Sequence, residues 1–266
     1  MKSFSTIARC AFIALAATLS VPALAVDGVV LIDQSKALAG NVTPGDTAGF
    51  PIVVSQPGSY RLTSNLAVPN ADTTAIEISS DRVTIDLNGF SIIGPVTCVT
   101  GFQCSGGEGD GVHVALGKTF RNITVQNGTI SGMGCDGIRL FGTGNVVDRM
   151  RLDNNGLDGL DVVGGEVTNS HASQNGRGGF IVSSGIVTHN TAEANSGNGF
   201  TTVHSALVTY NLAKGNGTAN SGSGGGPPPI GFALSAQTGC VGNVAENNAS
   251  GCPIPLGPNV CDGHSC

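Results

Sequence analysis

Residues 172–200 read ASQNGRGGFIVSSGIVTHNTAEANSGNGF, and this stretch decides the fold because it contains one pattern twice. An asparagine is followed by a glycine and a phenylalanine, and all three return in the same order: Asn175, Gly179 and Phe180, then Asn195, Gly199 and Phe200. The asparagine belongs to a longer column with nearly constant spacing: Asn155, Asn175, Asn195 and Asn216. A fixed period of about 20 residues is typical of a solenoid.

The apolar residues inside each repeat alternate, as in Val83, Ile85 and Leu87, which indicates short β-strands and not helices. A short strand with one apolar face cannot bury that face alone, but stacked copies can. The period is too long for a hexapeptide solenoid and too short for a propeller blade. We therefore predict an all-β, single-domain, right-handed parallel β-helix of about eight coils, with roughly 4.8 Å between coils.

The asparagine column has a physical reason in such a fold. Asparagine tolerates the left-handed backbone conformation that a tight corner needs, so we expect Asn155 and its equivalents to occupy that conformation. Stacked in register, the side-chain amides can also hydrogen-bond along the column. These asparagines are therefore expected to build corners and not to bind a ligand.

Composition agrees with one solenoid domain. Glycine accounts for 41 of 266 residues, charged residues for 11% and aromatic residues for 5%, and tryptophan is absent. A composition this apolar and rich in turn residues excludes a disordered chain and a helical bundle. We expect the β-helix over residues 56–249, an N-terminal cap over 26–55 and a Cys/Pro-rich C-terminal cap or tail over 250–266. Caps of this kind cover the unpaired strand edges at the ends of a solenoid.

Residues 1–25 have the features of a signal peptide. Lys2 and Arg9 precede an apolar run that ends in Ala23-Leu24-Ala25, an A-x-A cleavage site. The run is too short to remain as a membrane-spanning helix, and no second long apolar run follows. We therefore expect an exported protein, periplasmic or extracellular, that is monomeric and has no membrane span in its mature chain.

Cysteine content agrees with export into an oxidising compartment. Seven of the eight cysteines follow residue 25, and this odd number leaves one thiol over. Two pairs are close enough in sequence to close small loops: Cys98 with Cys104, and Cys261 with Cys266. Cys240 falls in the inward valine column and is expected to pack as a core thiol. A zinc site is less favoured, because the chain has no C-x-x-C pair.

The charge of the chain argues against some partners. Beyond residue 25 there are ten basic and 18 acidic residues, a net charge of −8, and no basic run. Nucleic acid and anionic membrane surfaces are therefore not expected as partners. The acidic balance allows a neutral glycan, whereas a polyuronide would need local cations or bridging calcium.

Three stretches carry a family resemblance: QPGSYRLTSNL (56–66), DRVTIDLNGFSIIG (81–94) and NNGLDGLDVVG (154–164). With them the chain resembles the right-handed parallel β-helix repeat family, the NosD-like and pectate-lyase-like group of exported bacterial proteins. The resemblance covers roughly residues 56 to 248 and implies the fold. Members with known activity are mostly polysaccharide lyases, glycoside hydrolases, esterases or uronan epimerases. No single activity follows, because function depends on the site and not on the fold.

The enzyme signatures of that group are missing here. The chain has no N-T-D or R-I-K segment of polygalacturonase-like hydrolases, no tryptophan-containing pectate-lyase signature and no D-P-H-[ED] segment of uronan epimerases. The segment GGEGDG (106–111) resembles a calcium-binding nonapeptide, but its aspartate is one residue early and the unit does not repeat. We interpret this segment as a turn.

Geometry nevertheless offers a candidate site. When the coils are aligned on the glycine–apolar column, the residue after the apolar one points outward on three successive coils: His113, Arg139 and Asp161. The residue before the glycine forms a second column: Asp110, Asp136 and Asp158. At the expected coil spacing the first three residues would lie within about 10 Å of one another. Three insertions precede the same strand and are expected to form one wall of a groove: 95–107, 133–135 and 217–229.

The chemistry of these residues suggests their roles. A histidine flanked by carboxylates suits a general base, and an arginine can hold a sugar carboxylate. We therefore take His113, Arg139 and Asp161 as catalytic candidates, and the aspartate column as ligand-binding residues for which calcium is the candidate metal. The alternative is ordinary turn chemistry with polar outward residues. The other histidines fall at different places in their repeats and are interpreted as solvated or corner residues: His171, His189 and His204.

Two functions from different classes remain. In the first, the protein is a non-catalytic exported solenoid that binds a glycan or a cell-surface partner, or serves as a scaffold. The missing enzyme motifs, the small number of coils and the lack of aromatic platforms for sugar stacking favour it. In the alternative, the protein is a polysaccharide lyase or uronan epimerase acting on an acidic polysaccharide, with His113 as base and the aspartate column holding calcium.

Overall fold

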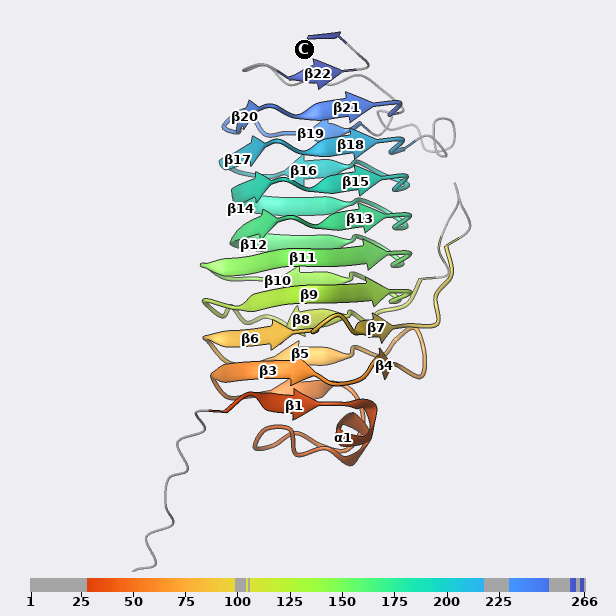
Figure 1. Cartoon of the computed structure of the whole chain (residues 1–266), viewed down its shortest axis with the longest axis vertical. Coiled ribbons are helices and arrows are strands. Elements are labelled where there is room, and N and C mark those ends of the chain that lie inside the picture. Colours follow the sequence, from red (N-terminus) through yellow and green to blue (C-terminus); the bar gives the residue numbers. More distant parts are fainter. Residues whose placement is uncertain are drawn as a thin grey trace, which may run out of the picture.

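The computed structural model describes residues 28–98, 104, 106–217, 230–248, 259–261 and 264–265. As predicted, the chain is an all-β solenoid, in which parallel strands stack coil upon coil along one axis (Figure 1). The stack has about seven turns, close to the expected eight. Among the described residues the one α-helix is α1 (Gln34–Ala39), at the N-terminal end of the stack.

Each coil contributes up to three strands, so the stack has three sheets, here called faces 1, 2 and 3. Face 1 contains β2 (Ile52–Val54), β5 (Ile76–Ile78), β8 (Val112–Val114), β10 (Ile138–Leu140), the first parts of β12 (Leu160–Thr168) and β14 (Phe180–Thr188), β16 (Phe200–Thr202) and β19 (Phe232–Ala233).

Face 2 contains β1 (Val30–Ile32), β3 (Gly58–Leu62), β6 (Val83–Asp86), the first parts of β9 (Thr124–Ser131) and β11 (Asn145–Asp153), the second parts of β12 and β14, β17 (Ala206–Thr209) and β20 (Gly239–Val241). Face 3 contains β4 (Leu66–Ala67), β7 (Ser91–Ile93), the second parts of β9 and β11, β13 (His171–Ser173), β15 (Thr191–Glu193), β18 (Leu212–Lys214), β21 (Val244–Glu246) and β22 (Val260–Cys261).

The core is made of in-register columns, one from each face. The face 1 column ends in three phenylalanines, Phe180, Phe200 and Phe232, whose rings stack with 4.9 Å between neighbouring centroids. The valine column of face 2 ends, as predicted, in a buried Cys240, which is paired in register with Val208. Stacking identical residues in this way buries the apolar face of every strand against its neighbours.

The columns of faces 1 and 3 compensate each other in size. Face 1 grows along the stack from Ile138 through leucine to phenylalanine. Over the same coils face 3 shrinks from Leu152 to alanine at Ala172 and Ala192. A side chain on Gly179, which precedes the first phenylalanine, would lie 3.0 Å from Cβ of Ala192. The interior volume of each coil is thus kept nearly constant, as close packing requires.

The corner asparagines form the predicted ladder of amides. Asn175 donates from Nδ2 to Oδ1 of Asn195 (2.9 Å) and to the carbonyl of Leu152 (2.9 Å), and its own Oδ1 accepts from the backbone and side chain of Asn155. A second ladder stands at the corner between faces 2 and 3: Ser170, Asn190, Asn211, Asn243 and Asn259. Both ladders are buried, so these amides satisfy backbone groups that water cannot reach.

The prediction that these asparagines adopt the left-handed conformation is wrong. The positive φ angle belongs to the residue before each one, as in Asn154 (58°), Gln174 (55°) and Ala194 (54°). The reason is that the ladder residue must turn its side chain inward to meet the next coil. The preceding residue therefore makes the bend, with its side chain outside the core.

Both ends of the described stack differ from regular coils. Within the expected N-terminal cap, β1 and β2 already pair in register with β3 and β5, so the stacking extends into that segment. The buried Asp46 lies in the loop between α1 and β2. Its carboxylate accepts from the backbone N–H groups of Val42 (2.9 Å) and Val53 (2.8 Å), which connects this loop to β2. At the other end, β23 (His264–Ser265) pairs antiparallel with β22.

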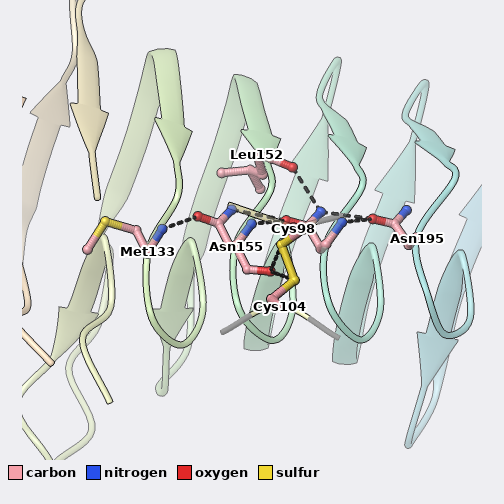
Figure 2. Close-up of a disulfide and its surroundings, with 7 residues drawn as sticks. Cys98, Cys104, Met133, Leu152, Asn155 and Asn195 are labelled. Carbon is pink, nitrogen blue, oxygen red and sulfur yellow. Dashed lines mark hydrogen bonds between the residues drawn. A yellow bond between two sulfur atoms is a disulfide. The ribbon is translucent and has the colours of Figure 1, made fainter. Parts of the chain in front are cut away.

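The predicted Cys98–Cys104 disulfide is present. Its two sulfur atoms lie 3.6 and 3.5 Å from the carbonyl oxygen of Asn155, beside the asparagine ladder (Figure 2). The other proposed pair involves Cys266, which lies outside the described residues. No helix in the described part of the chain is long and apolar enough to cross a membrane, and residues 1–25 lie outside that part.

We expect Asn175→Ala to lower the free energy of unfolding by about 3 kcal/mol, because it leaves the buried carbonyl of Leu152 and the buried N–H of Asn155 without their partner. The measurement is urea unfolding followed by far-UV circular dichroism. The matched control is Gln174→Ala, since the equivalent left-handed position one coil later is already Ala194. A change of less than about 0.5 kcal/mol is expected for the control. Equal effects of the two substitutions would contradict the importance of the ladder.

Candidate functional site

The register places the predicted residues of face 1 side by side. His113 pairs with Arg139, and Arg139 pairs with Asp161, on β8, β10 and β12. One residue that the sequence analysis missed extends this column, because Glu77 of β5 pairs with His113. The expected placement is therefore confirmed, while the catalytic and ligand-binding roles of these residues stay predictions.

His113 is held by carboxylates on both sides. Its Nδ1 lies 2.9 Å from Oδ2 of Asp110, and its Nε2 lies 3.3 Å from Oε2 of Glu77. Although it points away from the apolar core, the residue is only 6% exposed. Burial lowers the pKa of His113, but the hydrogen bonds and charges of the two carboxylates outweigh burial and leave that pKa raised. A protonated ring that donates from both nitrogens is a poor general base.

The aspartate column caps backbone groups of the next coil. Oδ1 of Asp110 accepts from the N–H of Asp136, and Oδ1 of Asp136 accepts from the N–H of Asp158, both at 3.0 Å. Oδ1 of Asp158 accepts from Gly178 at 2.7 Å. All three aspartates are buried. The column links successive coils as the asparagine ladder does, but in the opposite sense, because each carboxylate accepts from the following coil.

The second oxygens of the column face cationic side chains. Oδ2 of Asp110 meets His113, and Oδ2 of Asp158 accepts from Nε and Nη2 of Arg177. The ligand-type atoms that come together are those of Asp110, Asp136 and Cys135, within 4.8 Å of one another. Burial and the neighbouring aspartates raise the pKa of the Cys135 thiol to about 12. Calcium prefers a shell of oxygen ligands, so this set, with a thiol and side chains already paired to cations, does not suit it.

Crowding of carboxylates changes their protonation. Burial raises the pKa of Asp136 to about 7, and the charges of Asp158 and Asp110 add to this effect. Burial and the charge of Asp158 also raise the pKa of Asp161. Near neutral pH, part of the negative charge of face 1 is therefore removed by protonation.

Arg139 is the least constrained cation of this group. Its Nη1 lies 4.0 Å from Asp110 and its Nε lies 4.0 Å from Asp136, both beyond hydrogen-bond distance. The Nε atom is buried and has no hydrogen-bond partner among the described residues. The guanidinium lies over the ring of Phe141, 5.4 Å from its centroid. Arg139 is thus the group on face 1 best able to meet a ligand.

The first insertion lies along the corner before face 1, as expected. Val96 donates to the carbonyl of Gly132, and Gly107 donates to the carbonyl of Gly134, both at 2.9 Å. Its disulfide reaches the corner at Asn155 (Figure 2). Residues 218–229 of the third insertion lie outside the described part of the chain.

The sequence analysis did not select the residues of face 3 that line two open depressions of the surface. One open depression of about 340 Å³ is lined by His171, Ser173 and Glu193, and a more open one of about 500 Å³ is lined by His189 and Tyr210. A signal was available, because the residues flanking the inward alanines of face 3 recur with the same period as the asparagines. An alignment of the coils on the face 1 column alone does not show this recurrence.

No protein-family model, curated protein or solved structure matches this chain. The geometry of the faces is therefore the basis for assigning a function.

We expect Asp136→Asn to flatten the pH dependence of stability. The folded-state pKa of Asp136, about 7, lies above the value of about 4 for an unfolded aspartate, so wild-type stability falls as pH rises between these values. The raised pKa of His113 acts in the same direction as pH rises through it. The asparagine retains an oxygen for the N–H of Asp158 and carries no charge. It should recover between about 1 and 3 kcal/mol at pH 8 relative to pH 5.

Urea unfolding of wild type and variant at the two pH values measures this effect. Glu108→Gln removes one exposed carboxylate and should leave the pH dependence unchanged. Parallel pH profiles for wild type and Asp136→Asn would contradict the raised pKa.

Proposed function

We propose that this protein is an exported, non-catalytic β-helix that binds a glycan or a cell-surface partner, or serves as a scaffold. One observation carries the proposal: both ring nitrogens of His113 are paired with carboxylates, one of them on the preceding coil, and the inner oxygens of the aspartate column hold successive coils together. Groups engaged in this way contribute to a rigid surface and have little freedom for proton transfer.

We also propose that the chain belongs to the NosD-like and pectate-lyase-like group of β-helix repeat proteins. The fixed period of the sequence and the columns that it produces support this assignment. The apolar run before Ala23-Leu24-Ala25 supports export, and the Cys98–Cys104 disulfide agrees with an oxidising compartment.

The alternative is a polysaccharide lyase or uronan epimerase, and one observation favours it. Arg139 has a buried Nε without a hydrogen bond, and Asp136 beside it has a pKa of about 7. A guanidinium with unused donors can bind a sugar carboxylate, while a carboxyl group with a pKa near neutrality can exchange a proton. In that case Asp136, with its pKa near neutrality, would be the proton-transfer group in place of His113, whose two nitrogens are both paired.

We expect the protein to bind at least one polysaccharide without altering it. The chain would be purified after export and incubated with acidic and neutral polysaccharides, with calcium and with a chelator. Unsaturated-uronate absorbance, new reducing ends and co-sedimentation with insoluble polymer would be read together. Product that disappears in an Arg139→Ala/Asp136→Asn double variant would establish the alternative. Neither product nor binding on any polymer would overturn the glycan-binding proposal.

A further inference from the structure

Face 3 carries a groove on the side of the molecule that the predicted site does not use. Two open depressions lie on its strands, and β15 borders both, because Glu193 lines one and Thr191 lines the other. Arg151, His171 and Thr191 are paired in register on successive coils, so the lining residues follow the axis of the stack. We call the outward surface of β11, β13, β15, β18 and β21 the face 3 groove.

Two ion pairs lie in this groove, and Glu246 adds a further carboxylate at its end. Arg151 lies 3.5 Å from Asp153, and Lys214 lies 3.6 Å from Glu193. Burial raises the pKa of Asp153, but His171, Ser173 and Arg151 outweigh burial and lower it, so this carboxylate stays ionised. A ligand with its own charge would have to separate these pairs. An uncharged ligand leaves them intact.

A third pair of charged side chains on this face is wide enough for a hydroxyl group to bridge it. Nε2 of His171 lies 3.8 Å from Oε2 of Glu193, too far for a direct hydrogen bond, and both side chains are partly exposed. A hydroxyl oxygen between them can accept from the imidazole and donate to the carboxylate. The pairs around His113 on face 1 are shorter and lack such a gap.

An aromatic ring stands at the other end of the groove. Tyr210 is 59% exposed, and its ring stacks on His189 with 5.4 Å between centroids. Its φ of 55° is the left-handed value of this corner, where the equivalent positions hold Asn169, His189 and Gly242. A side chain on Gly242 would meet the Tyr210 ring at 2.6 Å, so that glycine makes room for it. An exposed tyrosine ring offers an apolar face and a polar hydroxyl group to a ligand.

We propose that the face 3 groove binds an uncharged polyhydroxylated chain, a neutral oligosaccharide, lying along the stack from Arg151 towards Glu246. The polar pairs of β13 and β15 would meet hydroxyl groups. Tyr210, Leu212 and Val244 would meet the apolar faces of the sugar rings. This inference rests on the proposed function and names its site and ligand class.

Isothermal titration calorimetry of the exported protein tests the proposal. The probes are the hexasaccharides cellohexaose, maltohexaose, laminarihexaose and mannohexaose, with hexagalacturonate as the charged counterpart. We expect binding of a neutral hexasaccharide and none of hexagalacturonate. Tyr210→Asn should weaken that binding about tenfold through loss of the ring contact. Asparagine suits the left-handed position, so the thermal midpoint should not fall, and the variant remains folded.

The control is Leu116→Asn, which removes an exposed apolar side chain after β8, outside the groove, and should leave the dissociation constant unchanged. Neutral binding that Tyr210→Asn leaves intact but Arg139→Gln abolishes would overturn the inference and retain the proposed function, with face 1 as the site. Binding of hexagalacturonate alone would also overturn the inference and retain the proposed function. Binding of none of the five probes would overturn the inference, and the polymer experiment would decide the proposed function separately.

Discussion

The hydrogen bond from a corner asparagine to the same asparagine one coil later is the interaction on which the rest of the structure depends. Each sharp corner removes backbone N–H and C=O groups from the strand pairing and buries them where water cannot replace the lost partners. The amide of Asn175 bonds to Leu152 and Asn155 of the preceding coil and to Asn195 of the following coil. This bond also fixes the register, because a shift of one residue would leave every ladder amide opposite the wrong group.

The charged surface of face 1 follows from the same constraint. At the same corner an aspartate uses one oxygen to accept from a backbone N–H of the next coil, and its other oxygen remains to attract a cation. Arg177 is thereby drawn to Asp158, and His113 to Asp110. A cluster that resembles an active site in sequence is thus explained in large part by corner chemistry. Because corner carboxylates of a solenoid can have a structural role, their presence alone does not indicate a catalytic site.

The fixed period of the repeat made much of this arrangement predictable. It located Cys240 in the valine column and brought His113, Arg139 and Asp161 together, because equal spacing in sequence becomes equal height on the stack. Glu77 could not be found in this way, since it is separated from His113 by an insertion that breaks the period. The burial of His113 was also beyond the repeat pattern, because it depends on that partner. The exposed ring of Tyr210 was not predicted, because the alignment on the glycine–apolar column gave no place on the stack to residues outside that column.

The equivalence of Asn175 and Asn195 has a consequence for how such a molecule changes in length. Both residues accept from the asparagine of the preceding coil and donate to that of the following one, in nearly identical geometry. Loss of the single coil that separates them would let Asn155 bond to Asn195 as it now bonds to Asn175. Unequal recombination within the gene can therefore remove or add whole coils, and the asparagines on the two sides of the change still form the same hydrogen bonds. His113 of β8 and Arg139 of β10 lie outside the exchanged segment, so the length of the rod can change while these two residues stay in place.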